Sequence, residues 1–229
     1  KYSFLDFSTL EQRKYFCERE VLLNNRFTKG LYLGVVPVRQ QGSEIWVDGI
    51  EGKVIDYAIK MKRLKEDRQM HRMLEHHQVT LKHIKDVAST LRKFHQQTTI
   101  IHQPFDRGVF ASRFNDLQSV ADFIGIALGP SSADIIANAV RTSDAFLKDH
   151  QGLFSKRVAD GWVRDCHGDL HSRNIFLYAR PILFDCIEFN DEFRQIDILD
   201  ELAFFCMDLE AAGFEDLSRS FMTLYFAMY

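Results

Sequence analysis

The segment from Cys166 to Leu177 constrains the fold of this chain more than any other part of the sequence. It has the form His-x-Asp-x-x-x-x-Asn, with His167, Asp169 and Asn174 at the fixed positions, and a short apolar run follows at once. A second apolar run ends at Asp185, eleven residues after Asn174. Because a hairpin of two short strands returns its end to the edge where it began, the pattern predicts that Asn174 and Asp185 converge beside the loop that carries Asp169.

These residue types suit the transfer of a phosphoryl group. That reaction needs a carboxylate that orients the attacking hydroxyl and accepts its proton, and oxygen ligands that hold Mg²⁺ across the phosphates of ATP. Asp169 is the candidate catalytic base, and we place His167 with it as a brace of the loop. Asn174 and Asp185 are the candidate magnesium ligands, since Mg²⁺ prefers oxygen donors. A metallophosphatase site at Asp169 and His171 would need a second ligand segment, which the sequence lacks.

The same residues carry a family resemblance. Residues 167–174 and 184–191 resemble the aminoglycoside-phosphotransferase and choline-kinase group of the protein-kinase-like fold. The chain is most similar to a bacterial subgroup that is often fused to a P-loop kinase domain, and segments 31–37 and 57–61 share in that similarity. The resemblance implies a small-molecule kinase that uses ATP and Mg²⁺ to phosphorylate a hydroxyl, with an amino sugar as one candidate acceptor.

Two departures from the family pattern concern acidic residues. Relatives outside the subgroup show Asp-x-Glu after the hairpin, whereas Glu188 here lies three residues past Asp185, which leaves its role as a metal contact in doubt. The family's Asp-Leu-Ala, whose aspartate braces the catalytic loop, stands here as Glu201-Leu202-Ala203. Glu201 could brace the loop with its longer side chain, and Asp197 and Asp200 are the alternatives.

The resemblance also implies how the nucleotide would be held. The helix expected at residues 9–27 would bear the glutamate that pairs with the ATP-binding lysine, with Glu20 as the first candidate and Glu18 as the second. Met61 would open the hinge that faces adenine. The glycine-rich loop and the lysine strand would then precede the first residue. A different register would take Lys60 as the lysine and Glu75 as its partner, but no Gly-x-Gly-x-x-Gly precedes Lys60.

Hydrophobic periodicity and glycine or proline punctuation predict an α+β fold of two lobes. Residues 1–62 would form a partial N-lobe, and residues 63–229 a helical C-lobe that carries the catalytic loop at 166–175 and the metal-binding hairpin end at 184–191. The expected antiparallel meander covers strands at 31–38, 44–47 and 54–61. Further elements are expected as helices at 66–76, 80–97, 113–127 and 132–150, a hairpin at 175–184, and a helical end from residue 196.

Bulk properties narrow the function classes. The formal charge of −3 gives no basic field for nucleic acid, and no apolar run is long enough to span a bilayer. Four widely spaced cysteines and the lack of a visible signal peptide suggest a cytoplasmic protein with reduced thiols. No Gly-x-x-x-x-Gly-Lys-Ser/Thr occurs, so a fused P-loop domain would lie outside this chain. We therefore expect a small-molecule hydroxyl acceptor as the partner, with no nucleic acid and no membrane.

Acidic residues are concentrated near the C-terminus. Between Asp185 and Asp216 there are eleven acids and one base, Arg194. Such a stretch would attract a polycationic acceptor, or it would simply form solvated helix faces.

Two functions of different classes remain after these arguments. The chain is either an active small-molecule kinase or a catalytically silent kinase-like module that binds a nucleotide or a partner. Retention of Asp169, Asn174 and Asp185 favours the active kinase. A protein kinase is less favoured, because no Asp-Phe-Gly and no Ala-Pro-Glu follow the loop.

Overall fold

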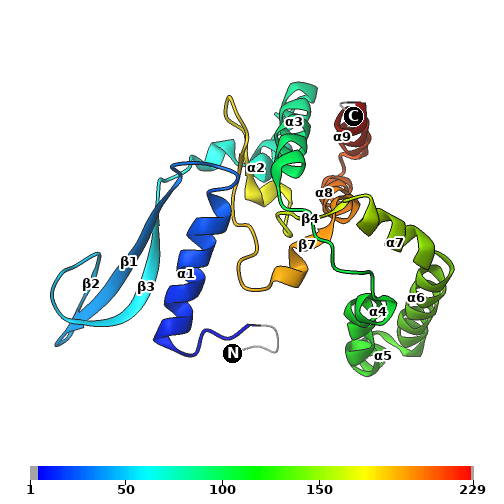
Figure 1. The fold of residues 1–229 in the computed structure, drawn as a ribbon, viewed down its shortest axis with the longest axis horizontal. Helices are drawn as coiled ribbons and strands as arrows, with labels where there is room; N and C mark the ends of the chain where they lie inside the picture. Colours follow the sequence, from blue (N-terminus) through cyan, green and yellow to red (C-terminus); the bar gives the residue numbers. More distant parts are fainter. Residues whose placement is uncertain (1–4, 228–229) are drawn as a thin grey trace. The chain divides into compact units, whose positions relative to one another are not determined.

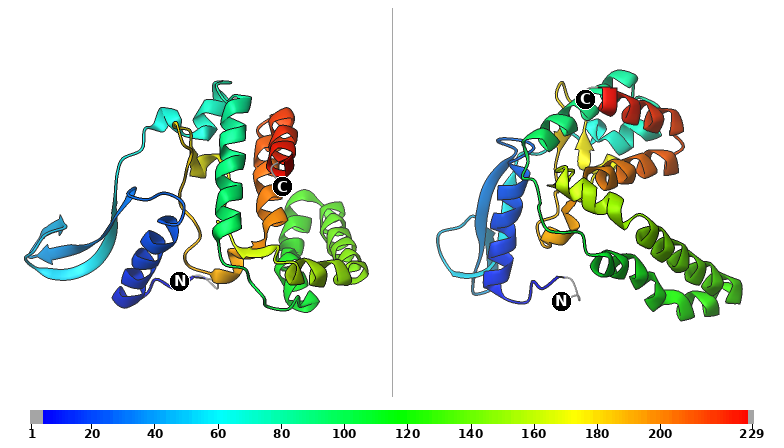
Figure 2. Two further views of the ribbon diagram at one scale, coloured as in Figure 1. Left: turned by 45° about the horizontal axis from the view of Figure 1, so that its top comes forward. Right: turned by 45° about the vertical axis from the view of Figure 1, so that its right-hand side comes forward.

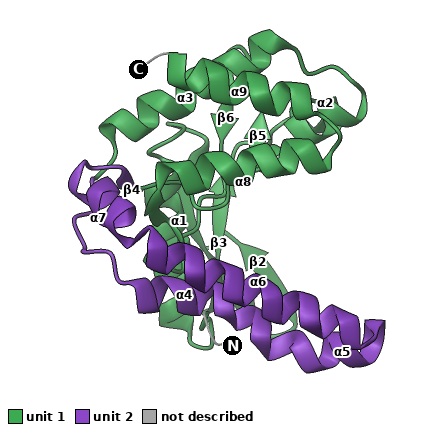
Figure 3. Ribbon diagram, turned by 90° about the vertical axis from the view of Figure 1, so that its right-hand side faces the viewer, with its two compact units in different colours: residues 1–99, 164–229 green, residues 100–163 purple. Residues whose placement is uncertain are grey.

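A computed structural model describes residues 5–227 of the chain. The chain forms two compact units, one made of residues 1–99 and 164–229 and the other of residues 100–163 (Figure 3). The mixture of helices and small antiparallel sheets confirms the α+β class. All candidate site residues lie in the first unit. The division into lobes at residues 62 and 63 remains a prediction.

The largest sheet of the first unit contains β1 (Tyr32–Gln41), β2 (Glu44–Val47) and β3 (Lys53–Met61). Its strands are antiparallel, as predicted, but the order is β2-β1-β3 and not that of a meander. The loop after β2 carries the chain across to the other edge of β1. This order leaves the four residues of β2 exposed, while the middle of β3 is partly covered by the helix described next.

Helix α1 (Leu10–Asn24) lies along this sheet (Figures 1 and 2). Thr9 starts it with a reciprocal capping box, because its hydroxyl accepts the Gln12 amide at 3.2 Å while the Gln12 side chain accepts the Thr9 amide at 3.1 Å. Arg13 then joins the helix to β3 through the Asp56 carboxylate at 2.7 Å. The predicted helix at 9–27 is therefore confirmed, with its end three residues earlier than expected.

The rest of the first unit is mainly helical. Helix α3 (Leu81–Gln97) packs beside α9 (Glu215–Ala227) (Figure 1), and every third or fourth residue of α3 from Ile84 to His95 is buried. The strands β5 and β6 form the predicted hairpin, with Ile175 opposite Leu183. The other elements of this unit are η1 (Glu66–Arg68), α2 (Met70–Glu75), η3 (Ser172–Asn174), β5 (Ile175–Phe176), β6 (Ile182–Leu183), η4 (Asp191–Phe193), β7 (Gln195–Asp197) and α8 (Ile198–Ala211).

Residues 100–163 form a helical unit. Phe105 and Phe154 stack with ring centroids 4.8 Å apart, and Phe110 and Phe146 complete this aromatic cluster. The sequence did not predict the helix that contains Phe154, because Gly152 lies near its start and glycine has a low helix propensity. The helices of this unit are α4 (Arg107–Asn115), η2 (Asp116–Val120), α5 (Ala121–Leu128), α6 (Pro130–Asp149) and α7 (Gln151–Ala159), and β4 (Val163–Asp165) leads back to the first unit, where it pairs with β7.

Among residues 5–227, no helix combines the length and the apolar character needed to cross a lipid bilayer. The four cysteines are free thiols, and three of them are buried.

Candidate functional site

The loop after β4 is organised by His167, whose side chain is fully buried. Its Nε2 lies 2.8 Å from the Phe184 carbonyl oxygen, which can only accept, so Nε2 carries the proton. Its Nδ1 accepts the Asp169 amide at 3.3 Å. Burial lowers the pKa of this imidazole, which therefore stays neutral. With both ring nitrogens engaged, His167 braces the loop and does not transfer protons.

Gly168 is required for this loop conformation. Its φ is +85°, a region that residues with a side chain rarely adopt. A Cβ atom at this position would lie 2.7 Å from the Phe193 carbonyl oxygen, well inside van der Waals contact. Glycine therefore allows the loop to approach the backbone that precedes β7.

Asp169 points its carboxylate toward two donors. Asn174 Nδ2 lies 3.0 Å from the Asp169 carbonyl oxygen and 3.2 Å from Oδ2, and His171 Nε2 lies 3.4 Å from the same Oδ2. The hydrogen bond and charge of His171 lower the pKa of Asp169, against the effect of partial burial. The side chain is 38% exposed. Asp169 is thus an ionised carboxylate that a small molecule can reach.

The hairpin brings Asp185 to the same edge as Asn174. The Phe184 amide donates to the Asn174 carbonyl oxygen at 3.2 Å, so the residues before and after the hairpin are adjacent. Asp185 adopts a left-handed φ of +64°, which aspartate tolerates better than most residues. Asp185 is exposed as a residue. The protein packed around its carboxyl group nevertheless desolvates it and raises its pKa, and the charge of Asp169 adds to this. The structure therefore brings together the three residues expected to bind metal and substrate.

Glu20 lies close to this cluster from the side of α1. Burial and the charges of Glu188 and Asp185 together raise the pKa of Glu20 to about 7, against the opposing effect of a hydrogen bond from Tyr32. The Tyr32 hydroxyl also accepts the Asp185 amide at 3.3 Å. Among the described residues, no lysine or arginine pairs with Glu20. Glu18, the second candidate, is exposed and pairs with Lys14 at 3.5 Å.

Met61 lies at the end of β3, opposite Tyr32 in the register of the sheet, and is 37% exposed. Apart from this backbone pairing, no contact of Met61 with Glu20, Asp169 or Asp185 is described. The alternative pair of Lys60 with Glu75 does not form, because Lys60 pairs with Asp48 at 2.7 Å and Glu75 pairs with Arg72 at 3.2 Å.

Glu201 is the acid that braces the loop. Its Oε1 accepts the amides of His167 at 2.5 Å and Gly168 at 3.0 Å, and its Oε2 accepts His95 Nε2 at 2.6 Å. Burial alone would raise the pKa of Glu201, but the hydrogen bond and charge of His95 and the Gly168 amide lower it below its usual range. Of the alternatives, Asp197 caps α8 through the Leu199 amide at 2.9 Å.

His95, Cys166 and Glu201 could in principle hold a metal ion, because one ligand atom from each lies within 4.8 Å of the others. Two features argue against this. The 2.6 Å between His95 Nε2 and Glu201 Oε2 is a direct hydrogen bond, whereas two ligands about 2 Å from one tetrahedral zinc ion lie roughly 3.3 Å apart. Burial also raises the pKa of the Cys166 thiol well above its usual range, so it is not a thiolate. The group is a structural brace.

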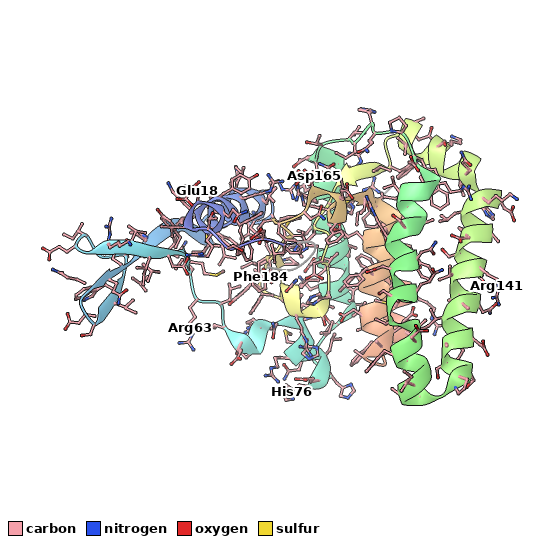
Figure 4. All side chains as sticks on the ribbon, turned by 90° about the horizontal axis from the view of Figure 1, so that it is seen from below. Glu18, Arg63, His76, Arg141, Asp165 and Phe184 are labelled. Carbon is pink, nitrogen blue, oxygen red and sulfur yellow. The ribbon has the colours of Figure 1, made fainter. Side chains whose placement is uncertain are left out.

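An arginine network joins α1 to the loop, and sequence reasoning missed it. Arg26 and Arg194 both bind the Asp165 carboxylate, at 2.8 and 2.5 Å, at the position labelled in Figure 4. Arg19 donates to the Glu188 carbonyl oxygen at 2.7 Å and pairs with Asp191, which Arg194 also binds. No local signal could reveal these contacts, since the partners of Asp165 are 139 and 29 residues away.

Comparisons with known proteins give relatives but no function. Uncharacterized proteins of Mycobacterium tuberculosis and Mycobacterium bovis are 30% identical to this chain over 226 residues. The match covers 97% of the chain and 43% of each relative, so the chain spans less than half the length of these proteins. No protein-family profile matches the chain. No solved structure matches it either.

Proposed function

We propose that this chain is the catalytic core of a small-molecule kinase that transfers the γ-phosphate of ATP to a hydroxyl group. The observation that carries the proposal is the convergence of Asp169, Asn174 and Asp185. Asn174 contacts Asp169 directly through its amide, and the hairpin hydrogen bond from Phe184 places Asp185 beside Asn174. A base and two oxygen ligands at one position are the groups that phosphoryl transfer requires.

The donor set fits magnesium. Asn174 uses its Nδ2 to bind Asp169, and its Oδ1 accepts no hydrogen bond from the described residues. The pKa of Asp185 is raised by burial and by its carboxylate neighbour, and a divalent cation would relieve both effects. An amide oxygen and a carboxylate suit Mg²⁺, which would neutralise charge on the phosphates of ATP when bound. Asn174 and Asp185 are therefore the residues that would hold it.

Asp169 would orient the acceptor. Its low pKa keeps the carboxylate ionised at neutral pH, so it accepts a hydrogen bond from the acceptor hydroxyl and takes the proton as that oxygen attacks. His167 and Glu201 hold the backbone of the loop through four hydrogen bonds with fixed directions, namely His167 Nε2 to Phe184, the Asp169 amide to His167, and the two amides bound by Glu201. The base thus stands on a rigid support, which is the main contribution a protein makes to this reaction.

The proposal includes a two-lobe, protein-kinase-like fold. α1 and the sheet of β1–β3 would form the partial N-lobe, with Glu20 as the partner of an ATP-binding lysine and Met61 at the hinge. The contacts of Tyr32 support this assignment, because they link Glu20 to the backbone of the metal-ligand candidate Asp185. This resembles the aminoglycoside-phosphotransferase and choline-kinase group, within which the acceptor stays open.

One observation favours a second candidate function. Glu20 has no basic partner among the described residues, and burial with the charges of neighbouring carboxylates raises its pKa to about 7. A catalytically silent module that binds a nucleotide or a partner would not need the lysine. Both candidates predict nucleotide binding, so turnover separates them.

The deciding experiment compares ATP turnover by the protein and by its Asp169→Asn variant, with Mg²⁺ and a panel of amino sugars and small alcohols including choline. The Asp216→Asn variant serves as the control, because that side chain is 99% exposed. If Asp169 is the base, its variant should lose about 100-fold or more in kcat, while the control retains full activity. Binding of ATP without turnover on any acceptor, unchanged in the Asp169 variant, would support the silent module and exclude the kinase.

A further inference from the structure

Two histidines of the loop are built alike. His171, like His167, accepts the amide of the residue two positions on with its Nδ1, and the distance to the Arg173 nitrogen is 3.2 Å. An amide can only donate, so Nδ1 of the neutral ring is unprotonated and Nε2 carries the hydrogen. In His167 that hydrogen points at the Phe184 carbonyl oxygen. In His171 the same nitrogen lies 3.4 Å from Oδ2 of Asp169.

Both donors of Asp169 therefore converge on one oxygen. Asn174 Nδ2 lies 3.2 Å from Oδ2 and His171 Nε2 lies 3.4 Å from it, whereas Oδ1 accepts no hydrogen bond from the described residues. A carboxylate can rotate about its bond to Cβ, and donors on one oxygen fix that rotation. The second oxygen is then left free for a substrate hydroxyl.

We propose that His171 is a positioning residue, which presents its Nε2–H to Oδ2 of Asp169 and so directs Oδ1 at the acceptor hydroxyl. The inference rests on the proposed function, and it assigns the orientation of the base within it. His171 would not transfer protons, because Nδ1 is engaged by the Arg173 amide. The 3.4 Å contact is long, as contacts of catalytic groups often are before substrate binds, and it would shorten in the complex with both substrates.

The surroundings of His171 support a fixed ring. The His171 side chain is 23% exposed, and the Phe204 ring packs edge-on at 6.4 Å between centroids. The next residue is also held, because the Ser172 amide donates to Asp208 at 2.8 Å. The attraction between His171 and Asp169 also lowers the pKa of the carboxylate. A base that must stay ionised therefore gains a stabilising hydrogen-bond donor as well as a direction from this neighbour.

Two substitutions separate the roles of the two ring nitrogens. Glutamine at position 171 supplies an amide donor near the place of Nε2, but it is a poor acceptor for the Arg173 amide. Asparagine supplies the acceptor near the place of Nδ1, where it is a favoured cap, but its short side chain cannot reach Asp169. A His102→Gln variant is the matched control, since that histidine is exposed in the other unit. The measurements are kcat, KM for each substrate and the melting temperature.

The proposal predicts that the two His171 variants rank in opposite orders by kcat and by melting temperature. His171→Asn should melt at or above the wild-type temperature yet lose about tenfold or more in kcat with KM unchanged, because orientation of the base acts in the transition state. His171→Gln should melt lower and keep kcat within about threefold. Suppose that Asp169→Asn abolishes turnover. Equal kcat in both His171 variants and the wild type, or a higher kcat in the asparagine variant than in the glutamine variant, would then overturn the positioning role of His171. Wild-type protein without Asp169-dependent turnover would overturn the proposed function instead, and the positioning role with it.

A readout independent of turnover is the tautomer of His171. Nitrogen-15 NMR of histidine-labelled protein at pH 9, where the ring is neutral, should show Nδ1 without a proton, and the signal is assigned by its loss in His171→Asn. A ring protonated on Nδ1 would turn the donor away from Asp169 and refute the inference.

Discussion

Replacing Glu201 with alanine should remove a large part of the stability of the first unit. Its carboxylate accepts three buried donors, the amides of His167 and Gly168 and the Nε2–H of His95. Each buried donor left without a partner costs about 1–3 kcal/mol, so three of them cost about 3 kcal/mol at the least. Domains of this size have about 5–15 kcal/mol of stability in total. The alanine variant should therefore be close to unfolding at room temperature.

Glutamine is the informative second variant. It keeps the volume of Glu201 and one acceptor oxygen, but it has no charge, and its NH₂ group meets the Nε2–H of His95. Hydrogen bonds to a charged group contribute about 1 kcal/mol more than those between neutral groups, so the two amide bonds that glutamine keeps should weaken by about 2 kcal/mol together, and the facing His95 donor adds to this loss. Urea unfolding followed by circular dichroism measures both variants, and an unchanged slope would show that the unfolding transition itself is preserved. Asp216→Ala, with its exposed side chain, should change the unfolding free energy by less than about 0.5 kcal/mol.

The pH dependence of this effect has a defined sign. The pKa of Glu201 is lowered in the folded state, so its contribution is present above the usual glutamate pKa and is lost as pH falls through the lower folded-state value. The gap in unfolding free energy between wild type and Glu201→Gln should therefore narrow in acid. An alanine variant within about 0.5 kcal/mol of wild type at pH 7 would refute the role of Glu201 as the brace of the loop.

Two further predictions test the neighbouring residues. Gly168→Ala should lower the unfolding free energy by more than the roughly 1–2 kcal/mol that a positive φ costs, because its Cβ would also meet the Phe193 carbonyl oxygen at 2.7 Å. Gly42→Ala is the control, because its φ is +60° with open space around it, so it should show the cost of the positive φ alone. Equal losses of unfolding free energy in the two variants would contradict the close contact at Gly168. Glu20 has a pKa raised to about 7, so the folded state retains its proton longer than the unfolded state and stability falls as pH rises from about 4.5 to 7. The melting temperature of Glu20→Gln should accordingly rise relative to that of the wild type between pH 5 and pH 8. A difference in melting temperature that stays constant over this range would show that Glu20 is not held in a desolvated, negatively charged site.

Local patterns predicted the parts of this fold that depend on nearby residues. The cap at Thr9 works through Gln12, three residues away, and the hairpin forms because two short apolar strands flank a turn with Pro181. The predicted order of the strands was wrong because it depends on residues that are distant in the sequence. Periodicity indicates that β3 is a strand, but not which edge of β1 it will join, since that choice depends on where α1 packs.

The contacts that hold the candidate site were beyond such patterns. Tyr32 and Asp185 are 153 residues apart, and Arg26 reaches Asp165 across 139 residues. A single arginine in a sequence is equally compatible with solvent and with a buried pair, because its long side chain adapts to both. Arg194 illustrates this: it is the one base of an acid-rich stretch, and its side chain is only 2% exposed. Only the folded chain decides which acids surround it.

That acid-rich stretch shows how charge counting misleads. Asp191 is bound by Arg19 and Arg194, Asp208 accepts the Ser172 amide, and Glu210 accepts the Ser218 hydroxyl. These three acids serve the fold, so they are not free to attract a polycationic acceptor. The carboxylates that do influence one another at the candidate site are few, chiefly those of Glu20, Glu188 and Asp185, and each has a pKa raised by burial. Carboxylates that lie side by side repel one another when ionised. A divalent cation bound between them would relieve this repulsion. In the proposed kinase, magnesium and the fold would account for the acidity of this part of the chain without appeal to the charge of the acceptor.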